Sequence, residues 1–335
     1  MQKRTHWLLL AATAVVAMSG VTTVVVGQAT ASAATSKDFG PTVITGVPAA
    51  PPVGTPATQK VVPLATIETP MSAGATAYVY SELRAYDADQ ANLIDNEIRC
   101  SGVGKSNVVM GENVLPASGS PAHRDIRIIT RFLVSATSAG ALSCTLYLRT
   151  ASTSSSVARE TVSGTVRFAS TSVGEDAGGT AMQKSLPAGN IPVTGSTTTP
   201  VVDRTLPPGY TKLAVIADVE YHRCAGTQEC PATYSTASFT LTATTSGGAG
   251  CASAVAAKTE ETVPRGVNHA AIPLYTTVVV KPGCDQVRAK VTTTRVAGDV
   301  GSVGGAAPGL TDETGQSGDT PNHSSAMTHL FVVPS

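Results

Sequence analysis

Two histidines stand at matching places in the sequence, and each has a glutamate upstream. His123 and His269 both precede an alternating apolar segment by three residues. Glu112 and Glu261 lie at comparable positions before them. A carboxylate and an imidazole that lie close together can act as general base and acid or bind a metal ion. Because two intact active sites in tandem are uncommon, the repetition favours a structural role, in which each imidazole bonds a loop carbonyl at the start of a strand.

A second group of candidates is an acidic segment between two alternating stretches. Calcium prefers about six to eight hard oxygen ligands, which loops can supply. The segment departs from an EF-hand loop, since Ala91 and Asn92 stand where that motif needs an Asx residue and a glycine. It is therefore a weak calcium candidate, and a solvated turn that keeps the sheet from pairing with neighbours is the favoured interpretation. The candidate ligands are Asp87, Asp89, Asn92, Asp95 and Glu97.

The remaining chemistry-bearing residues favour a protein that is not an enzyme. His323 and His329 lie near Asp319 in the C-terminal tail, where we expect solvent exposure rather than a metal site. After residue 33 the sequence contains no GxSxG, HExxH, GxxxxGK[ST] or GxGxxG motif. A serine triad depends on geometry and not on a motif, so it stays an alternative. We expect no catalytic residue and no cofactor.

Composition limits the class of protein further. The chain has 335 residues, which predicts roughly two domains. Its 23 basic and 23 acidic residues cancel, so no broad field favours nucleic acid or an anionic membrane. With 4% aromatic residues, 31 glycines and 21 prolines, the chain suits many short strands and turns. The alanine-, threonine- and valine-rich, lysine-poor composition is typical of exported proteins of high-GC bacteria.

The first 33 residues are typical of a secretory signal peptide. Lys3 and Arg4 form a positive start, an apolar stretch covers 7–18, and Ala-Ser-Ala at 31–33 gives a small-residue cleavage pattern. An uncleaved anchor is the alternative, because apolar residues continue to Val26. We expect cleavage, a secreted extracellular protein, and no membrane insertion afterwards.

The rest of the chain carries an internal repeat. Residues 76–86 and 212–222 alternate in the same way between apolar and polar side chains. Further on, residues 126–134 match 272–280 without a gap. An alternation of period two predicts strands with one buried face. The repeat therefore predicts two copies of one β-rich domain.

The end of the chain resembles the end of the first copy. Residues 328–335 have the same pattern as 165–170, so we predict that the C-terminus is the last strand of the second copy. The Gly-rich stretch 299–320 would then be a loop that leads to this strand.

Six cysteines follow residue 33, and an even number predicts disulfides in an oxidising compartment. Metal binding by thiolates is disfavoured because no CxxC pair occurs. The repeat favours one bridge at the same place in each copy, and the remaining two cysteines would close a short loop. The predicted pairs are Cys100–Cys144, Cys251–Cys284 and Cys224–Cys230.

Each copy offers about six to eight short strands and no convincing amphipathic helix. We therefore expect two tandem disulfide-bridged β-sandwiches, either an immunoglobulin-like Greek key or a jelly roll. The core tryptophan of antibody domains is absent, since the one tryptophan is Trp7. The predicted organisation is a signal peptide (1–33), a Pro-rich tether (34–56), β-sandwich repeat 1 (57–172), a linker (173–190) and β-sandwich repeat 2 (191–335).

These features lead to an expected function without a named ligand. We expect a secreted, non-enzymatic binding or structural protein at or outside the cell surface, whose partner is a protein or cell-surface ligand. One alternative is a secreted hydrolase with its site between the two domains. Another is a secreted protease inhibitor that uses the Cys224–Cys230 loop, which occurs only in the second copy.

Overall fold

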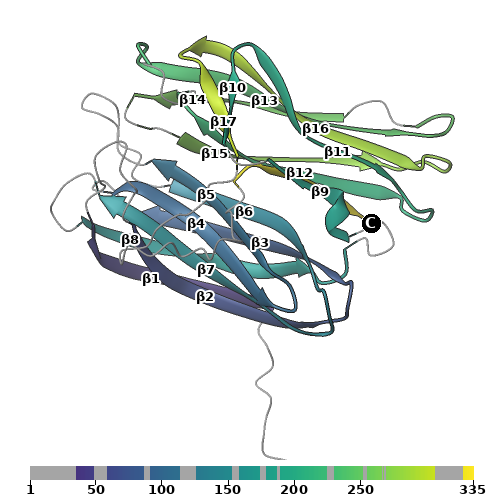
Figure 1. The fold of residues 1–335 in the computed structure, drawn as a ribbon, viewed down its shortest axis with the longest axis horizontal. Helices are drawn as coiled ribbons and strands as arrows, with labels where there is room; N and C mark the ends of the chain where they lie inside the picture. Colours follow the sequence, from purple (N-terminus) through teal and green to yellow (C-terminus); the bar gives the residue numbers. More distant parts are fainter. Residues whose placement is uncertain are drawn as a thin grey trace, which may run out of the picture. The chain divides into compact units, whose positions relative to one another are not determined.

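The structure is a computed structural model, and its described part is nearly all β-strand (Figure 1). No helix in this part is long and apolar enough to cross a membrane. The described residues are 35–48, 59–86, 91–113, 126–152, 158–173, 179–186, 189–224, 230–251, 255–265, 267, 269–305 and 327–335.

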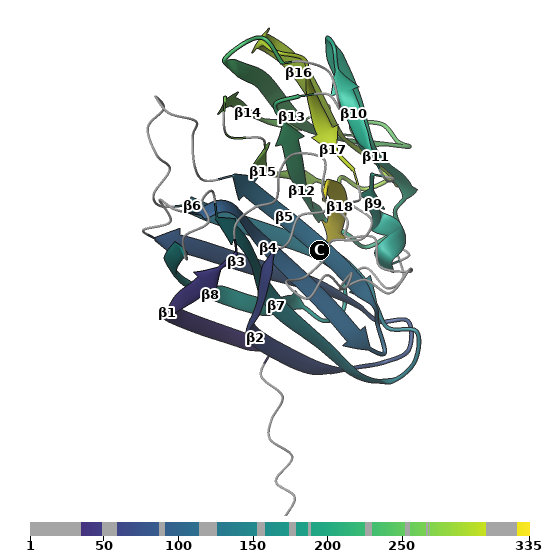
Figure 2. The same ribbon diagram turned by 60° about the vertical axis from the view of Figure 1, so that its left-hand side comes forward.

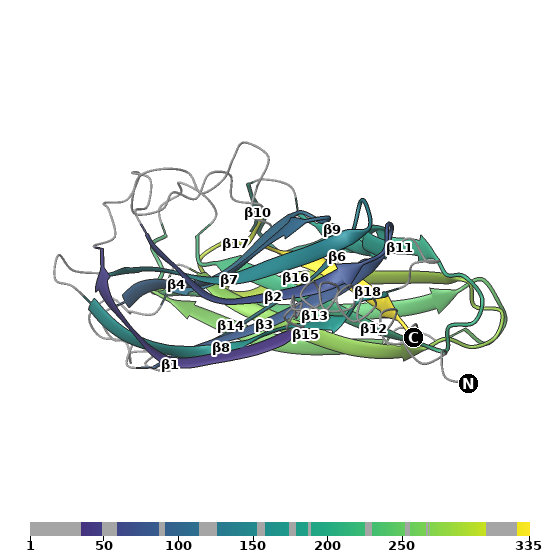
Figure 3. The same ribbon diagram turned by 90° about the horizontal axis from the view of Figure 1, so that it is seen from below.

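The first copy is a sandwich of two four-stranded antiparallel sheets, ordered β1-β8-β3-β6 and β2-β7-β4-β5. Figure 3 shows β1 beside β8 and β2 beside β7. The strands are β1 (Ser36–Val47), β2 (Lys60–Met71), β3 (Thr76–Tyr86), β4 (Ala91–Gly102), β5 (Ser106–Asn113), β6 (Ile126–Ser135), β7 (Gly140–Ser152) and β8 (Ala158–Ser170).

The second copy is also a sandwich, and one of its sheets is ordered β11-β16-β13-β14. In the other sheet β12 pairs with β15 on one side and with β17 and β18 on the other (Figure 2). The elements are η1 (Gly179–Met182), β9 (Gln183–Ser185), β10 (Asn190–Val193), β11 (Ser196–Thr205), β12 (Lys212–His222), β13 (Tyr234–Ser246), β14 (Val255–Pro264), β15 (His269–Val279), β16 (Gln286–Gly298), β17 (Gly301–Gly304) and β18 (His329–Pro334).

The two copies share one strand order, with β12 in the place of β3 and β15 in the place of β6. The place of β8 is filled by β17 and then β18, which run antiparallel to β12 one after the other. The predicted C-terminal strand is therefore confirmed. Two tandem β-sandwiches are confirmed as the fold class.

The predicted tether is wrong for residues 36–47, because these form β1. Ile44 and Val47 are buried in the first core, and β1 pairs with β8 along the edge of its sheet. Edge strands tolerate proline, and Pro41 lies where the pairing with β8 shifts between Phe39 and Thr42. The proline content therefore did not prevent a strand.

The predicted linker is wrong for residues 179–186, which belong to the second sandwich. Gln183–Ser185 form β9, which pairs with β18. Met182 and Leu186 are buried in the second core. This segment reads as a linker in sequence because its strand has only three residues.

All three disulfides join the predicted cysteines. Cys100 and Cys144 are direct cross-strand partners of β4 and β7. In the second copy Cys251 follows β13 and Cys284 precedes β16, so that bridge lies just beyond the ends of the corresponding strands.

Candidate functional site

The outer face of β12 lies against the edges of the first sandwich. In β12, Ala217, Val219 and Tyr221 are buried in the core of the second sandwich. The alternate residues Asp218 and Glu220 are also buried, although they lie on the opposite face. Strands β5 and β6, which are edge strands of the two sheets of the first sandwich, contact β12 and β15. We call this contact region the junction.

At the junction, side chains of the second sandwich bond the free backbone edge of β6. The amide of Arg131 donates to Asp218 Oδ2 at 2.8 Å, and its carbonyl bonds the ring Nε2 of His329. Two residues on, the amide of Leu133 donates to Gln183 Oε1 at 2.7 Å. The side-chain amide of Gln183 donates back to the Leu133 carbonyl at 3.4 Å. An edge that would otherwise attract another strand is thus closed within the chain.

Arg131, Asp218 and His329 form a buried polar cluster at this edge. Arg131 Nε donates to Asp218 Oδ1 at 3.0 Å, and Nη2 donates to the carbonyls of Ala217 and Leu274 at 3.1 Å each. His329 Nε2 lies 3.4 Å from Asp218 Oδ2. Burial acts to raise the pKa of Asp218, but Arg131 and His329 outweigh burial and hold that pKa below its usual value.

The expected solvent exposure of His329 is wrong. The residue begins β18, which lies between β12 and β9 in its sheet, and its side chain is fully buried. His323 and Asp319, the other residues of that prediction, lie outside the described residues.

A second polar cluster lies farther along β12. Glu220 and His222 are two residues apart and so share one face of the strand, and His269 of β15 pairs directly with His222. One carboxylate oxygen and one nitrogen from each ring lie within 4.8 Å of one another. Glu220 is only 2% exposed, whereas the side chain of His222 is 21% exposed.

The first sandwich contributes Gly111 and Asp95 to this second cluster. The Gly111 amide of β5 donates to the Glu220 carboxylate. A Cβ on Gly111 would lie 2.1 Å from Asp95 Oδ1 and 3.0 Å from His269 Nε2, so both side chains use the space that glycine leaves. On the other side, a Cβ on Gly304 of β17 would lie 2.6 Å from His222 Nε2. Two glycines therefore make room for the cluster.

Burial and neighbouring charges shift the pKa values of the two carboxyl groups of this cluster in opposite directions. Burial and the charge of Glu220 raise the pKa of Asp95 well above its usual value. Burial also acts to raise the pKa of Glu220, but His269, His222 and the Gly111 amide outweigh burial and hold it below its usual value. Burial lowers the pKa of His269 to about 4, so its ring is neutral near pH 7.

The structure brings together part of what the sequence singled out. His269 begins its strand, as predicted, but it faces Glu220, His222 and Asp95. Glu112 and Glu261 lie close enough to interact, and burial with the charge of Glu261 raises the pKa of Glu112 to about 7. His123 lies outside the described residues.

The described part of the acidic segment, residues 91–97, lies in strand β4 and not in a turn. Asp95 and Glu97 lie within β4, and both are buried. Glu97 is bonded by Arg99, whose Nε donates to Oε1 at 2.9 Å, and by Nε of Arg149, which donates to Oε2. Both oxygens of the Glu97 carboxylate therefore accept hydrogen bonds from guanidinium groups. Asp87, Asp89 and the side chain of Asn92 lie outside the described part of the chain.

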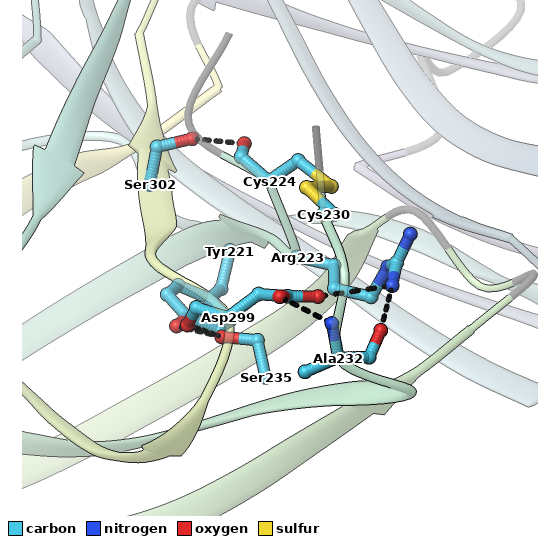
Figure 4. Close-up of a disulfide and its surroundings, with 8 residues drawn as sticks. All are labelled: Tyr221, Arg223, Cys224, Cys230, Ala232, Ser235, Asp299 and Ser302. Carbon is cyan, nitrogen blue, oxygen red and sulfur yellow. Dashed lines mark hydrogen bonds and ion pairs between the residues drawn. A yellow bond between two sulfur atoms is a disulfide. The ribbon is translucent and has the colours of Figure 1, made fainter. Parts of the chain in front are cut away.

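The Cys224–Cys230 loop is braced at its base (Figure 4). Arg223 Nη1 donates to Asp299 Oδ2 at 3.1 Å and to the Ala232 carbonyl at 2.9 Å. Asp299 Oδ1 accepts from the Ala232 amide at 2.8 Å, and the Ser302 hydroxyl donates to the Cys224 carbonyl at 3.0 Å. Residues 225–229 themselves lie outside the described residues.

Comparison with known proteins identifies no relative. No family model matches the chain, and no curated protein matches it. The stem and receptor binding domain of the spike protein P1 from bacteriophage PM2 is 8% identical over 84% of this chain and 99% of that one, with a TM-score of 0.26. The CBM22-1–CBM22-2 tandem domain from Paenibacillus barcinonensis Xyn10C is 10% identical over 91% and 97%, with a TM-score of 0.22. Likeness at this level carries no argument about function.

Proposed function

We propose that this chain is a secreted, non-enzymatic binding or structural protein that acts at or outside the cell surface. The observation that carries the proposal is the junction, where Asp218, Gln183 and His329 bond the backbone edge of β6. A contact that uses buried backbone groups of one sandwich and buried side chains of the other holds the pair in one arrangement. The protein would present the loops of both sandwiches at a fixed spacing.

A fixed spacing suits a binding or scaffolding role. Two modules that engage one surface together bind more tightly than either alone, provided that their geometry permits both contacts. Three disulfides are consistent with an extracellular protein, as is the finding that no helix of the described part could cross a membrane. The signal-like residues 1–33 support secretion.

Secretion and surface binding can be tested one after the other. The full gene, with and without Lys3 and Arg4 replaced by Glu, is expressed in a bacterium that exports proteins. We expect the unaltered chain in the medium with a new N-terminus after Ala33, and loss of export in the variant. The exported protein should then bind saturably to the producing cells.

A matched variant tests the role of the fixed spacing. Arg131→Ala removes the side chain that bonds Asp218 while leaving the loops unchanged. If both sandwiches engage the surface, the apparent affinity of this variant falls about tenfold or more. Turnover of ester, peptide or glycoside substrates that His269→Gln abolishes would instead favour a hydrolase with its site between the domains.

A protease inhibitor is the second candidate, and the braced base of the Cys224–Cys230 loop favours it. A loop closed by a disulfide and held at its base loses little entropy when a protease binds it. Equimolar inhibition of a serine or cysteine protease, lost in the Cys224→Ala/Cys230→Ala variant, would support this candidate. No inhibition across a panel of secreted proteases would remove it.

A further inference from the structure

We propose that Glu220, His222 and His269 bind a divalent transition-metal ion at the junction, and that zinc is the ion they fit. The proposal does not depend on the proposed function. One carboxylate oxygen and two imidazole nitrogens are a donor set that zinc uses in proteins, with a fourth position left for water or another ligand. Calcium and magnesium are disfavoured because they prefer sites made of oxygen atoms.

The backbone places these donors before any ion is considered. His222 and His269 are direct cross-strand partners of β12 and β15, and Glu220 follows on the same face. Zinc bonds of about 2.0–2.2 Å place tetrahedral ligand atoms roughly 3.3 Å apart. Nε2 of His222 already lies 3.2 Å from Oε1 of Glu220, and all three ligand atoms lie within 4.8 Å. Small side-chain rotations would therefore bring the three ligand atoms within bonding distance of one zinc ion.

Two buried atoms of the cluster lack hydrogen bonds, which points independently to a ligand. Oε2 of Glu220 has no hydrogen-bond partner among the described residues. Nε2 of His222 has no hydrogen-bond partner among these residues either, although it lies 3.2 Å from Oε1 of Glu220. Leaving such atoms buried and unbonded is costly, and buried polar atoms in native proteins are rarely left so. A metal ion would accept one lone pair from each of these two atoms.

A further buried carboxyl group lies beside the three donors, that of Asp95 in the first sandwich. Asp95 faces His269 across the space beside Gly111, which suits a carboxylate that orients a metal-bound imidazole. We therefore assign Asp95 a positioning role and not a place among the three ligands.

The experiment uses the full mature chain without a histidine tag, stripped with a chelator. Zinc is titrated by calorimetry, and the zinc-loaded protein is examined by X-ray absorption at the zinc edge. We expect one zinc ion per chain and the scattering of two imidazole rings. His222→Gln and His269→Gln should each weaken zinc binding about a hundredfold, and Asp95→Asn about tenfold. Asp203→Asn, an exposed carboxylate of β11, serves as the matched control and should change nothing.

Two outcomes would overturn the proposal. One is the absence of stoichiometric zinc binding to the unaltered chain. The other is zinc bound equally well by the His222→Gln/His269→Gln double variant, which would place the ion at other side chains. If a variant fails to fold in circular dichroism, the absorption spectrum of the unaltered protein decides, because fewer than two imidazole rings around zinc contradict the assignment.

Discussion

The Asp218 carboxylate of the second sandwich accepts three hydrogen bonds from Arg131 of the first sandwich, one from its backbone amide at 2.8 Å and two from its guanidinium, through Nε at 3.0 Å and Nη2 at 2.5 Å. The backbone contact fixes the position of β6, and the charged contact neutralises a side chain that the junction buries. The second sandwich therefore replaces the strand that would otherwise pair with this edge.

Breaking this pair should strongly destabilise the protein. Asp218→Ala leaves the Arg131 guanidinium buried without its partner, and removal of one member of a buried pair costs about 3–5 kcal/mol. Urea unfolding followed by circular dichroism measures the loss. The Asp203→Ala control breaks an exposed pair, with Arg288 3.8 Å away, and should cost less than about 1 kcal/mol. Equal effects of the two substitutions would contradict the account of the junction.

Leu133 should contribute more to the stability of the protein than its place on an edge strand suggests. Its side chain belongs to the apolar cluster of the second sandwich, although β6 belongs to the first. Tyr78 packs beside it in the same cluster and makes an edge-to-face contact with Phe331 at 5.3 Å. Leu133→Ala should therefore lower the free energy of unfolding by about 2–5 kcal/mol. Val279→Ala, at a side chain 62% exposed, is the control; a cost for Leu133→Ala no larger than this control would show that the junction is not packed.

The strands themselves could be predicted because each sheet buries one face. In β16, for example, Val287, Ala289 and Val291 are buried while Gln286 and Arg288 are exposed. Alternation of this kind depends only on neighbouring residues, so it can be recognised in the sequence.

The alignment of the repeat placed the side chains on the correct faces of the strands, but it did not give the correct register between the paired strands. In the first copy Ile126 pairs with Ala85. In the second copy Tyr221, the counterpart of Ala85, pairs with Ala270, which lies two residues before the predicted Ile272. A shift of two residues keeps every side chain on its own face, so the alternation does not reveal the difference.

The junction could not be predicted from the sequence. Asp218, Glu220 and His222 alternate with apolar residues, which is the pattern of a strand with one face in water. Asp218 and Glu220 are polar because they meet polar backbone and side-chain groups of the other copy. Nothing within β12 distinguishes a polar face that meets water from one that meets a second domain.

The three disulfides should contribute unequally to stability. The Cys100–Cys144 bridge closes a span of 44 residues, and the Cys224–Cys230 bridge closes one of 6. In the chain-entropy model the longer loop gives about 4 kcal/mol and the shorter about 2–2.5 kcal/mol. Paired alanine substitutions, compared by urea unfolding under oxidising conditions, measure both losses. A larger loss from the short bridge would contradict this order and would assign its stabilisation to the braced base instead.

The buried carboxyl of Glu160 should make the protein less stable as pH rises. Burial raises its pKa to about 7 from an ordinary 4.5, since only Thr150, through its hydroxyl at 3.2 Å, and the charge of Lys60 oppose burial. A raised pKa means that the folded protein binds the proton more tightly than the unfolded chain, so this contribution is complete below about pH 4.5 and is lost as pH rises through 7. The full loss is about 3 kcal/mol by pH 9.

Glu160→Gln should remove most of this dependence. The free energy of unfolding, measured in urea between pH 5 and 9, should fall less steeply in this variant than in the unaltered protein, and the variant should be the more stable of the two at pH 9. Glu112, whose pKa is also raised to about 7, keeps part of the slope in both proteins. Glu68→Gln, at an exposed position of β2, should leave the profile unchanged. Parallel profiles for Glu160→Gln and the unaltered protein would show that Glu160 titrates alike in the folded and unfolded chains.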